Sequence, residues 1–205
     1  MKALLKPLVF LLSLYPALYL LYAVYLAFTG GENLLGPDQA KTLSLETGTW
    51  AIRFLILALA ITPLRYLFNW PYAWQFRRMI GLFALFYTSL HFLVFLVFIL
   101  QWEWLQLGLE IAERPYITFG FAAFVPMLLL GLTSFNGLRR KMGRNWKRLH
   151  RLVYLINILA VLHVTWIIRS SFGEALLYAT LVALFLLYRV LRYYSPGVRR
   201  FTLRP

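Results

Sequence analysis

The segment MIGLFALFYTSLHFLVFLVFILQW, residues 79–102, runs for 24 residues without an Asp, Glu, Lys or Arg. A helix needs about 20 predominantly apolar residues to cross the hydrocarbon core of a bilayer. The apolar residues follow one another without the alternation that a strand of a membrane barrel requires. The segment therefore predicts a membrane-spanning helix, and its single histidine, His91, is predicted to lie inside the membrane.

Five further apolar runs accompany this segment, at about residues 7–28, 48–64, 115–138, 148–168 and 175–191. The first run is too long for a signal peptide, whose apolar region has about 7–15 residues. Hydrophobic residues make up 61% of the chain and charged residues 14%, against about 25% charged in soluble domains. We therefore expect an all-α integral membrane protein, with a bundle of six helices forming one transmembrane domain over residues 1–205.

The distribution of charge predicts the orientation of this bundle. The net charge of +14 could indicate a nucleic-acid partner, but the basic residues lie in short segments between the apolar runs, where they act as topology signals. Of the 21 Lys and Arg residues, 17 lie in four parts of the chain: the head, the segments 65–78 and 139–151, and the tail after residue 188. All seven Asp and Glu residues lie in the other connections. Both termini are therefore predicted to be cytoplasmic, with membrane lipid and not nucleic acid around the chain.

Histidine is the informative residue type, because the chain has only three histidines and no cysteine. His91 lies twelve residues past Met79, and His163 lies fifteen residues past Arg148; both spans run outward from these cytoplasmic starts. At about 1.5 Å per residue, the two histidines lie within roughly 5 Å of the same depth. Two facing imidazoles at one depth of a helix bundle are typical of a haem with two axial histidines. The alternative is that both are membrane histidines bonded to neighbouring backbone or to Ser and Thr side chains.

His150 lies thirteen residues before His163, or roughly 20 Å nearer the cytoplasm. This step suits a second haem stacked below the first. However, the corresponding positions before His91 are Arg77 and Arg78, and neither arginine is a haem ligand. The pattern leaves open whether His150 binds an inner haem with an unusual second ligand or is an interfacial histidine.

Three arginines are candidate partners for the haem propionates. Arg53 is the one charge well inside an apolar run, and we weigh an outer propionate for it against snorkelling to the lipid headgroups. Arg77 and Arg78 could neutralise an inner propionate, although the topology signal alone explains them. Gly81 would allow a porphyrin to approach closely, but small residues in membrane helices also serve helix packing.

Other functions fit the residues less well. A cofactor-free transporter needs polar residues along a pathway, and the spans offer only Asn157 with a few Ser and Thr. An intramembrane hydrolase lacks a set of Ser, His and acid at one depth. A stand-alone ferric reductase, delivering electrons to iron at the outer face, stays open beside electron delivery to a partner protein.

Local motifs along the whole chain, taken in their order and spacing, resemble the MsrQ (YedZ) family, small relatives of the ferric-reductase and NADPH-oxidase transmembrane domain. The motifs are Thr47-Gly48 with Trp50, Thr62-Pro63-Leu64-Arg65, Arg77-Arg78-Met79-Ile80-Gly81-Leu82, Leu90-His91, Arg114-Pro115-Tyr116-Ile117, Leu132-Thr133-Ser134, Trp146-Lys147-Arg148-Leu149-His150-Arg151-Leu152-Val153-Tyr154, Leu162-His163 and Trp166.

This resemblance implies that His91, His150 and His163 hold one or two haem b groups in a bacterial inner membrane protein. It implies that electrons pass to a periplasmic molybdopterin reductase that repairs oxidised methionine. The electron donor implied for the family is the quinone pool or a cytosolic flavin reductase with FMN. The chain would then be an electron-transfer subunit without catalytic residues of its own.

Overall fold

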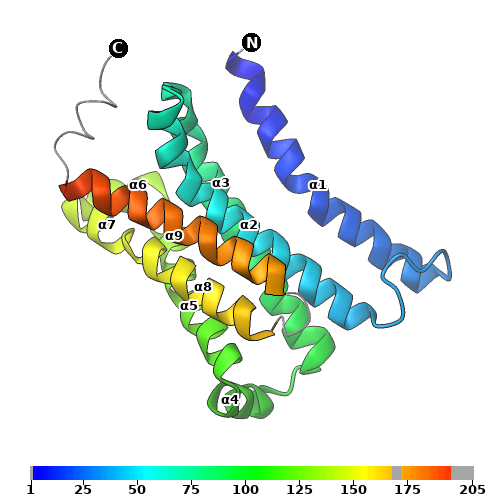
Figure 1. Cartoon of the computed structure of the whole chain (residues 1–205). Helices are drawn as coiled ribbons and strands as arrows, with labels where there is room; N and C mark the ends of the chain where they lie inside the picture. The colour runs from blue at the N-terminus through cyan, green and yellow to red at the C-terminus, as the bar shows by residue number, and fades with distance from the viewer. Residues whose placement is uncertain (1, 168–171, 195–205) are drawn as a thin grey trace.

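The computed structural model describes residues 2–167 and 172–194, and nearly all of these residues are helical (Figure 1). The elements in chain order are α1 (Lys2–Thr29), α2 (Gln39–Leu67), the 3-10 helix η1 (Pro71–Phe76), α3 (Arg77–Val94), the π-helical turn η2 (Phe95–Ile99), α4 (Trp104–Glu113), α5 (Pro115–Leu132), α6 (Asn136–Met142), α7 (Arg144–Leu149), α8 (Leu152–Ile167) and α9 (Phe172–Tyr194).

Six helical segments within the described residues are long and apolar enough to cross a membrane, which confirms the predicted six-span, all-α class. They are Leu4–Thr29, Gln39–Leu67, Pro71–Ile99, Pro115–Leu132, Arg144–Ile167 and Gly173–Tyr194. The second span begins at Gln39, well before the apolar run that starts at Gly48. Its first turn is capped by Asp38, whose carboxylate accepts a hydrogen bond from the Lys41 backbone N–H at 3.0 Å.

The bundle is organised around α2, which packs against α3 along most of its length and also contacts α8 and α9. Helices α5 and α8 form the second closely packed pair. One buried cluster joins α2 and α3 to α5 and α8, and includes Phe54, Phe83, Tyr87, Met127 and Ile156. By contrast, α1 exposes most of its large apolar side chains, as a helix facing lipid does.

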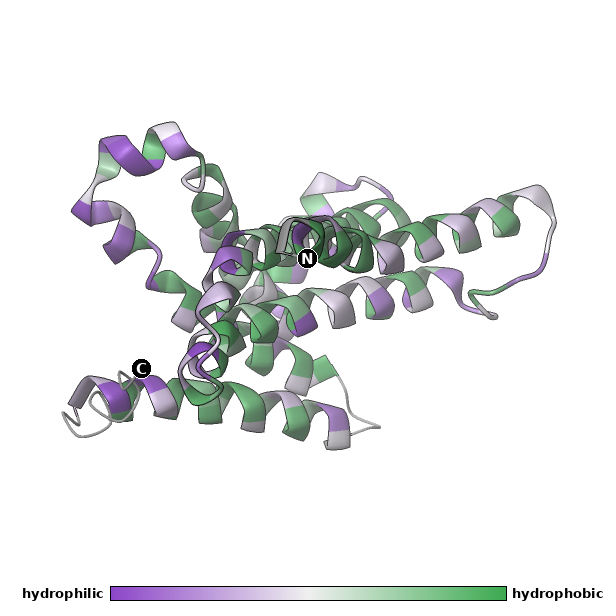
Figure 2. Cartoon of the chain, turned by 90° about the horizontal axis from the view of Figure 1, so that it is seen from above, coloured by the Kyte–Doolittle hydropathy of each residue, from purple (hydrophilic) through white to green (hydrophobic). Residues whose placement is uncertain are grey.

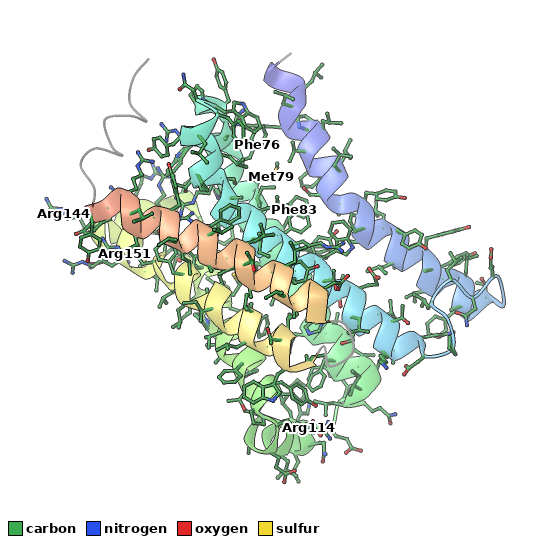
Figure 3. The ribbon with its side chains drawn as sticks, in the orientation of Figure 1. Phe76, Met79, Phe83, Arg114, Arg144 and Arg151 are labelled. Atoms are coloured by element: carbon green, nitrogen blue, oxygen red, sulfur yellow. The ribbon has the colours of Figure 1, made fainter. Side chains whose placement is uncertain are left out.

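Charge and hydropathy separate along the bundle. Hydrophobic colour fills the long helices, and hydrophilic colour gathers at their ends and in the connections (Figure 2). The start of α1, the end of α9 and the basic helices α6 and α7 lie at one end, and α4 lies at the other (Figure 1). Arg144 and Arg151 mark the basic end and Arg114 the α4 end (Figure 3).

Candidate haem site

His91 on α3 and His163 on α8 face each other across the bundle. Their ring centroids are 6.1 Å apart and their planes are inclined by 76°. An imidazole nitrogen binds a first-row transition metal at about 2 Å. Two such bonds, added to the distance from each ring centre to its nitrogen, give a separation of about this size. The two rings are therefore spaced to bind one iron atom from opposite sides.

Each imidazole is held by a backbone carbonyl from a neighbouring helix. His91 Nδ1 lies 2.9 Å from the carbonyl oxygen of Ser44, and His163 Nδ1 lies 2.6 Å from that of Tyr116. A carbonyl oxygen only accepts hydrogen bonds, so each Nδ1 carries the proton and donates it. The other nitrogen, Nε2, then keeps its lone pair in the neutral ring. This is the tautomer that a metal-binding histidine needs.

A cavity of about 1200 Å³ surrounds the two histidines. This volume exceeds that of most small-molecule pockets, which have about 300–1,000 Å³, so it is large enough for a porphyrin. Its walls come from α2, α3, η2, the α4 region, α5, α8 and α9, and they are mostly apolar. The wall residues include Ala51, Leu55, Phe92, Phe95, Ala123, Phe124, Ile156 and Trp166.

The donor set fits haem better than a metal held by protein ligands alone. Within residues 2–167 and 172–194, no group of three or more His, Cys, Asp or Glu residues could hold a metal ion. A structural zinc site takes four protein ligands and a catalytic one takes three. A porphyrin supplies four equatorial nitrogens itself, so that two opposed imidazoles complete the coordination of its iron.

His150, at the C-terminal end of α7, lies outside this cavity. Its ring stacks on Trp146, with the centroids 3.9 Å apart and the planes inclined by 29°. Its Nε2 lies 3.3 Å from the Thr133 hydroxyl, and the Trp146 indole N–H donates to the Thr133 carbonyl at 2.9 Å. The structure therefore brings His91 and His163 together and leaves His150 in a separate polar cluster.

The three predicted arginines also lie outside the lining of this cavity. The Arg53 guanidinium lies over the Trp50 ring, and its Nε donates to the Tyr178 hydroxyl at 3.4 Å. Arg77 lies over Trp74, 5.1 Å from the ring centroid. Arg78 donates a hydrogen bond to the Asn136 side chain at 2.9 Å.

Two other cations line the cavity and escaped the sequence analysis. They are Lys41, in the first turn of α2, and Arg114, just before α5. Arg114 donates to the Tyr116 hydroxyl at 3.0 Å and pairs with Glu110 at 2.9 Å. The hydrogen bond to Tyr116 and the charge of Glu110 raise the pKa of Arg114, so it is positive at any ordinary pH. The signal available in the sequence was its place in the motif Arg114-Pro115-Tyr116-Ile117, directly before a membrane span.

Comparison with known proteins places this chain in a family. Residues 47–161 match the family described as "Ferric reductase like transmembrane component". A protein from Xanthomonas euvesicatoria pv. vesicatoria (strain 85-10), named "Protein-methionine-sulfoxide reductase heme-binding subunit MsrQ", is 43% identical over 97% of this chain and 90% of its own length. Proteins of the same name from Xanthomonas campestris pv. campestris (strain 8004) and Polaromonas naphthalenivorans (strain CJ2) are also similar.

The Xanthomonas campestris protein is 45% identical over 85% of this chain and 79% of its own length. The Polaromonas protein is 40% identical over 95% of this chain and 88% of its own length. No solved structure matches. The chain has the six membrane helices predicted from its sequence and aligns with these relatives over most of its length. It therefore belongs to the MsrQ family, within the ferric reductase like transmembrane components.

Proposed function

We propose that this protein holds haem b between His91 and His163 and acts as the membrane electron-transfer subunit of a methionine-sulfoxide reductase system. The observation that carries the proposal is the opposed pair of imidazoles, 6.1 Å apart, inside a cavity of about 1200 Å³. The similar proteins named above are heme-binding subunits of protein-methionine-sulfoxide reductase, which agrees with this geometry.

The bound haem would supply one-electron chemistry, cycling between its ferric and ferrous forms. His91 and His163 would hold the haem iron through Nε2, since the Ser44 and Tyr116 carbonyls hold both rings through Nδ1. Most of the cavity wall around the two rings is apolar, including Phe92 and Phe124, and would limit contact between the haem and water. Low polarity would disfavour the additional positive charge of the ferric form, and so the wall would raise the reduction potential of a bound haem.

The charge distribution supports a direction of electron transfer. Arg144 and Arg151 lie at one end of the bundle and Arg114 lies at the α4 end (Figure 3), and both Arg114 and Lys41 line the cavity. By the positive-inside rule the basic end faces the cytoplasm. The haem cavity would then open towards the periplasm, where a molybdopterin-containing reductase accepts the electron. The proposed donors are the quinone pool or a cytosolic flavin reductase with FMN, acting at the basic end.

His150 is the proposed ligand of a second haem nearer the cytoplasm. Its depth and its place in the matched family segment support this role. Arg77 lies within electrostatic range of His150 and could balance a propionate there. Arg53, which contacts Tyr178 in the cavity wall, is proposed to act on the outer propionates only through that tyrosine.

The test is the reduced-minus-oxidised absorption spectrum of the detergent-purified protein, with haem quantified as the pyridine haemochrome. We expect a b-type spectrum that His91→Ala and His163→Ala each abolish for the outer haem. The matched control is His150→Ala, which should keep that spectrum because His150 lies outside the cavity. A colourless wild-type protein, made in cells with ample haem, would refute the proposal and favour a cofactor-free transporter.

A further inference from the structure

The two halves of the haem site repeat each other. In the first half, the Ser44 carbonyl on α2 holds His91 on α3; in the second, the Tyr116 carbonyl on α5 holds His163 on α8. Both carbonyls lie 47 residues before their histidine. The second half follows the first by 72 residues, the difference between 116 and 44 and also between 163 and 91.

A glycine lies one helical turn after each carbonyl, Gly48 after Ser44 and Gly120 after Tyr116. Residues four apart share a helix face, so each glycine lies beside the imidazole that its helix holds. A Cβ added at Gly48 would lie 3.1 Å from Nδ1 and Cε1 of His91. A Cβ added at Gly120 would lie 2.8 Å from the same atoms of His163.

Backbone conformation does not account for these glycines. Both lie inside long helices, and neither is among the glycines with positive φ. Ordinary helix packing does not account for them either, because the nearest atoms to both added Cβ positions belong to the histidine rings. Gly131 on α5 shows the contrasting case, since a Cβ there would meet the flexible side chain of Leu85.

We propose that Gly48 and Gly120 are positioning residues that set the reach and the plane of the two axial imidazoles. The inference rests on the proposed haem site. Each ring is fixed at two points: its Nδ1 by a carbonyl and its edge by bare helix backbone one turn further on. A side chain at either glycine would push the ring away from its helix, and so change the 6.1 Å separation and the 76° angle.

The experiment compares full-length Gly48→Ala and Gly120→Ala with a matched control, Gly81→Ala. Gly81 lies in the same membrane span as His91 but does not line the cavity around the two histidines, and a Cβ there would meet nothing within 4 Å. The readouts are the haem-to-protein ratio, the midpoint potential and the low-temperature EPR spectrum. In a ferric haem with two imidazole ligands, the lowest-field g value depends on the angle between the imidazole planes.

We expect Gly120→Ala to shift the lowest-field g value and to weaken haem binding about tenfold or more, as changes next to metal ligands commonly do. Gly48→Ala should do the same to a smaller extent, because its contact is looser. Gly81→Ala should match the wild type. Wild-type EPR, potential and haem content in both Gly48→Ala and Gly120→Ala would overturn the inference while leaving the haem site standing.

Failure of the proposed function would look different, since the wild type itself would then contain no haem. Folding is checked by a single symmetrical peak in gel filtration. If Gly120→Ala yields no folded protein, Gly48→Ala decides the question against Gly81→Ala. An unchanged g value and potential in folded Gly48→Ala would then count against a positioning role.

Discussion

Arg189 on α9 donates a 2.7 Å hydrogen bond to the backbone carbonyl of Leu59 on α2. In a regular helix this carbonyl would accept from the N–H of the residue four positions later, which here is Pro63 and has no N–H. Arg189 also donates to the Thr62 hydroxyl at 3.2 Å and lies over the Tyr154 ring. A partly buried cation in a membrane span is thus held by a carbonyl that a proline has released.

This relationship predicts a coupled pair of substitutions. Arg189→Met should destabilise the protein by about 1.5–3 kcal/mol, the usual range for a hydrogen bond to a charged group. In a Pro63→Ala background the same substitution should cost less, because residue 63 then supplies the helical N–H to the Leu59 carbonyl. A double-mutant cycle, measured by denaturant unfolding in mixed micelles, tests the coupling. Strictly additive effects would contradict it.

The cations that line the cavity predict the sign of changes in reduction potential. Reduction adds an electron, so removal of a nearby positive charge disfavours it. Lys41→Gln and Arg114→Gln should each lower the haem midpoint potential, and the decrease should be larger at low salt, where exposed charges are less screened. Glu110→Gln should raise it, since Glu110 pairs with Arg114. Potentiometric titration at two salt concentrations measures all three variants.

The control for these variants is Arg53→Gln. Arg53 contacts Trp50 and Tyr178 and does not line the cavity, so its loss should change the potential less. A larger effect at Arg53 than at Lys41 or Arg114 would restore Arg53 as the cation nearest the haem and would contradict the assignment of the cavity lining.

The sequence predicted the depth of the histidines but not the partners of their rings. Depth along a helix follows from residue count, because the rise per residue is nearly constant; this is why His91 and His163 were matched correctly. The direction in which a side chain leaves its helix depends on how that helix is rotated in the bundle. Arg53 was considered for a propionate, whereas in the structure it does not line the cavity and contacts Tyr178 of the cavity wall.

The carbonyls that hold the histidines have no sequence signature at all. Any residue could supply the carbonyl of Ser44 or Tyr116, so only packing identifies them. The glycine four residues after each carbonyl is visible in the sequence, because the residue type itself shows that the side chain is missing. Gly81 was considered for close approach to a porphyrin, whereas Gly48 and Gly120 contact the histidine rings. The sequence alone does not tell which glycine lies beside a histidine ring, because that depends on which helices pack against each other.

The hydrogen bonds of Tyr87 attach α1 to the bundle, and they lead to a further prediction. Its hydroxyl donates to the Ser13 carbonyl at 2.8 Å and accepts from the Ala17 N–H at 3.1 Å, so it joins both members of one helical i, i+4 pair. Tyr87→Phe leaves Ser13 and Ala17 able to bond to each other, and so the cost should be only about 1 kcal/mol. The attachment of α1 should weaken while the haem content stays at the wild-type value.

Limited proteolysis and unfolding in mixed micelles measure this effect. Thr88→Val on the same helix is the control, because the Thr88 hydroxyl bonds only within its own helix, to the Ala84 carbonyl. Faster cleavage near α1 in Tyr87→Phe than in Thr88→Val supports the role of Tyr87. Equal cleavage in the two variants would show that apolar packing alone holds α1.

The last prediction concerns His150, which is either the ligand of an inner haem or an interfacial histidine. The two hypotheses predict different haem-to-protein ratios in the His150→Ala variant. As the ligand of an inner haem, His150 must free its Nε2 from the Thr133 hydroxyl, 3.3 Å away. Thr133→Val should then leave the haem-to-protein ratio unchanged, whereas His150→Ala should lower it and keep the spectrum of the outer pair. Trp146→Phe is the control: it keeps a ring against His150 and removes only the indole hydrogen bond to Thr133. Trp146→Phe should keep the full haem content and lose only stability. If His150→Ala behaves in the same way, then His150 is an interfacial histidine between α5 and α7, and the chain carries a single haem.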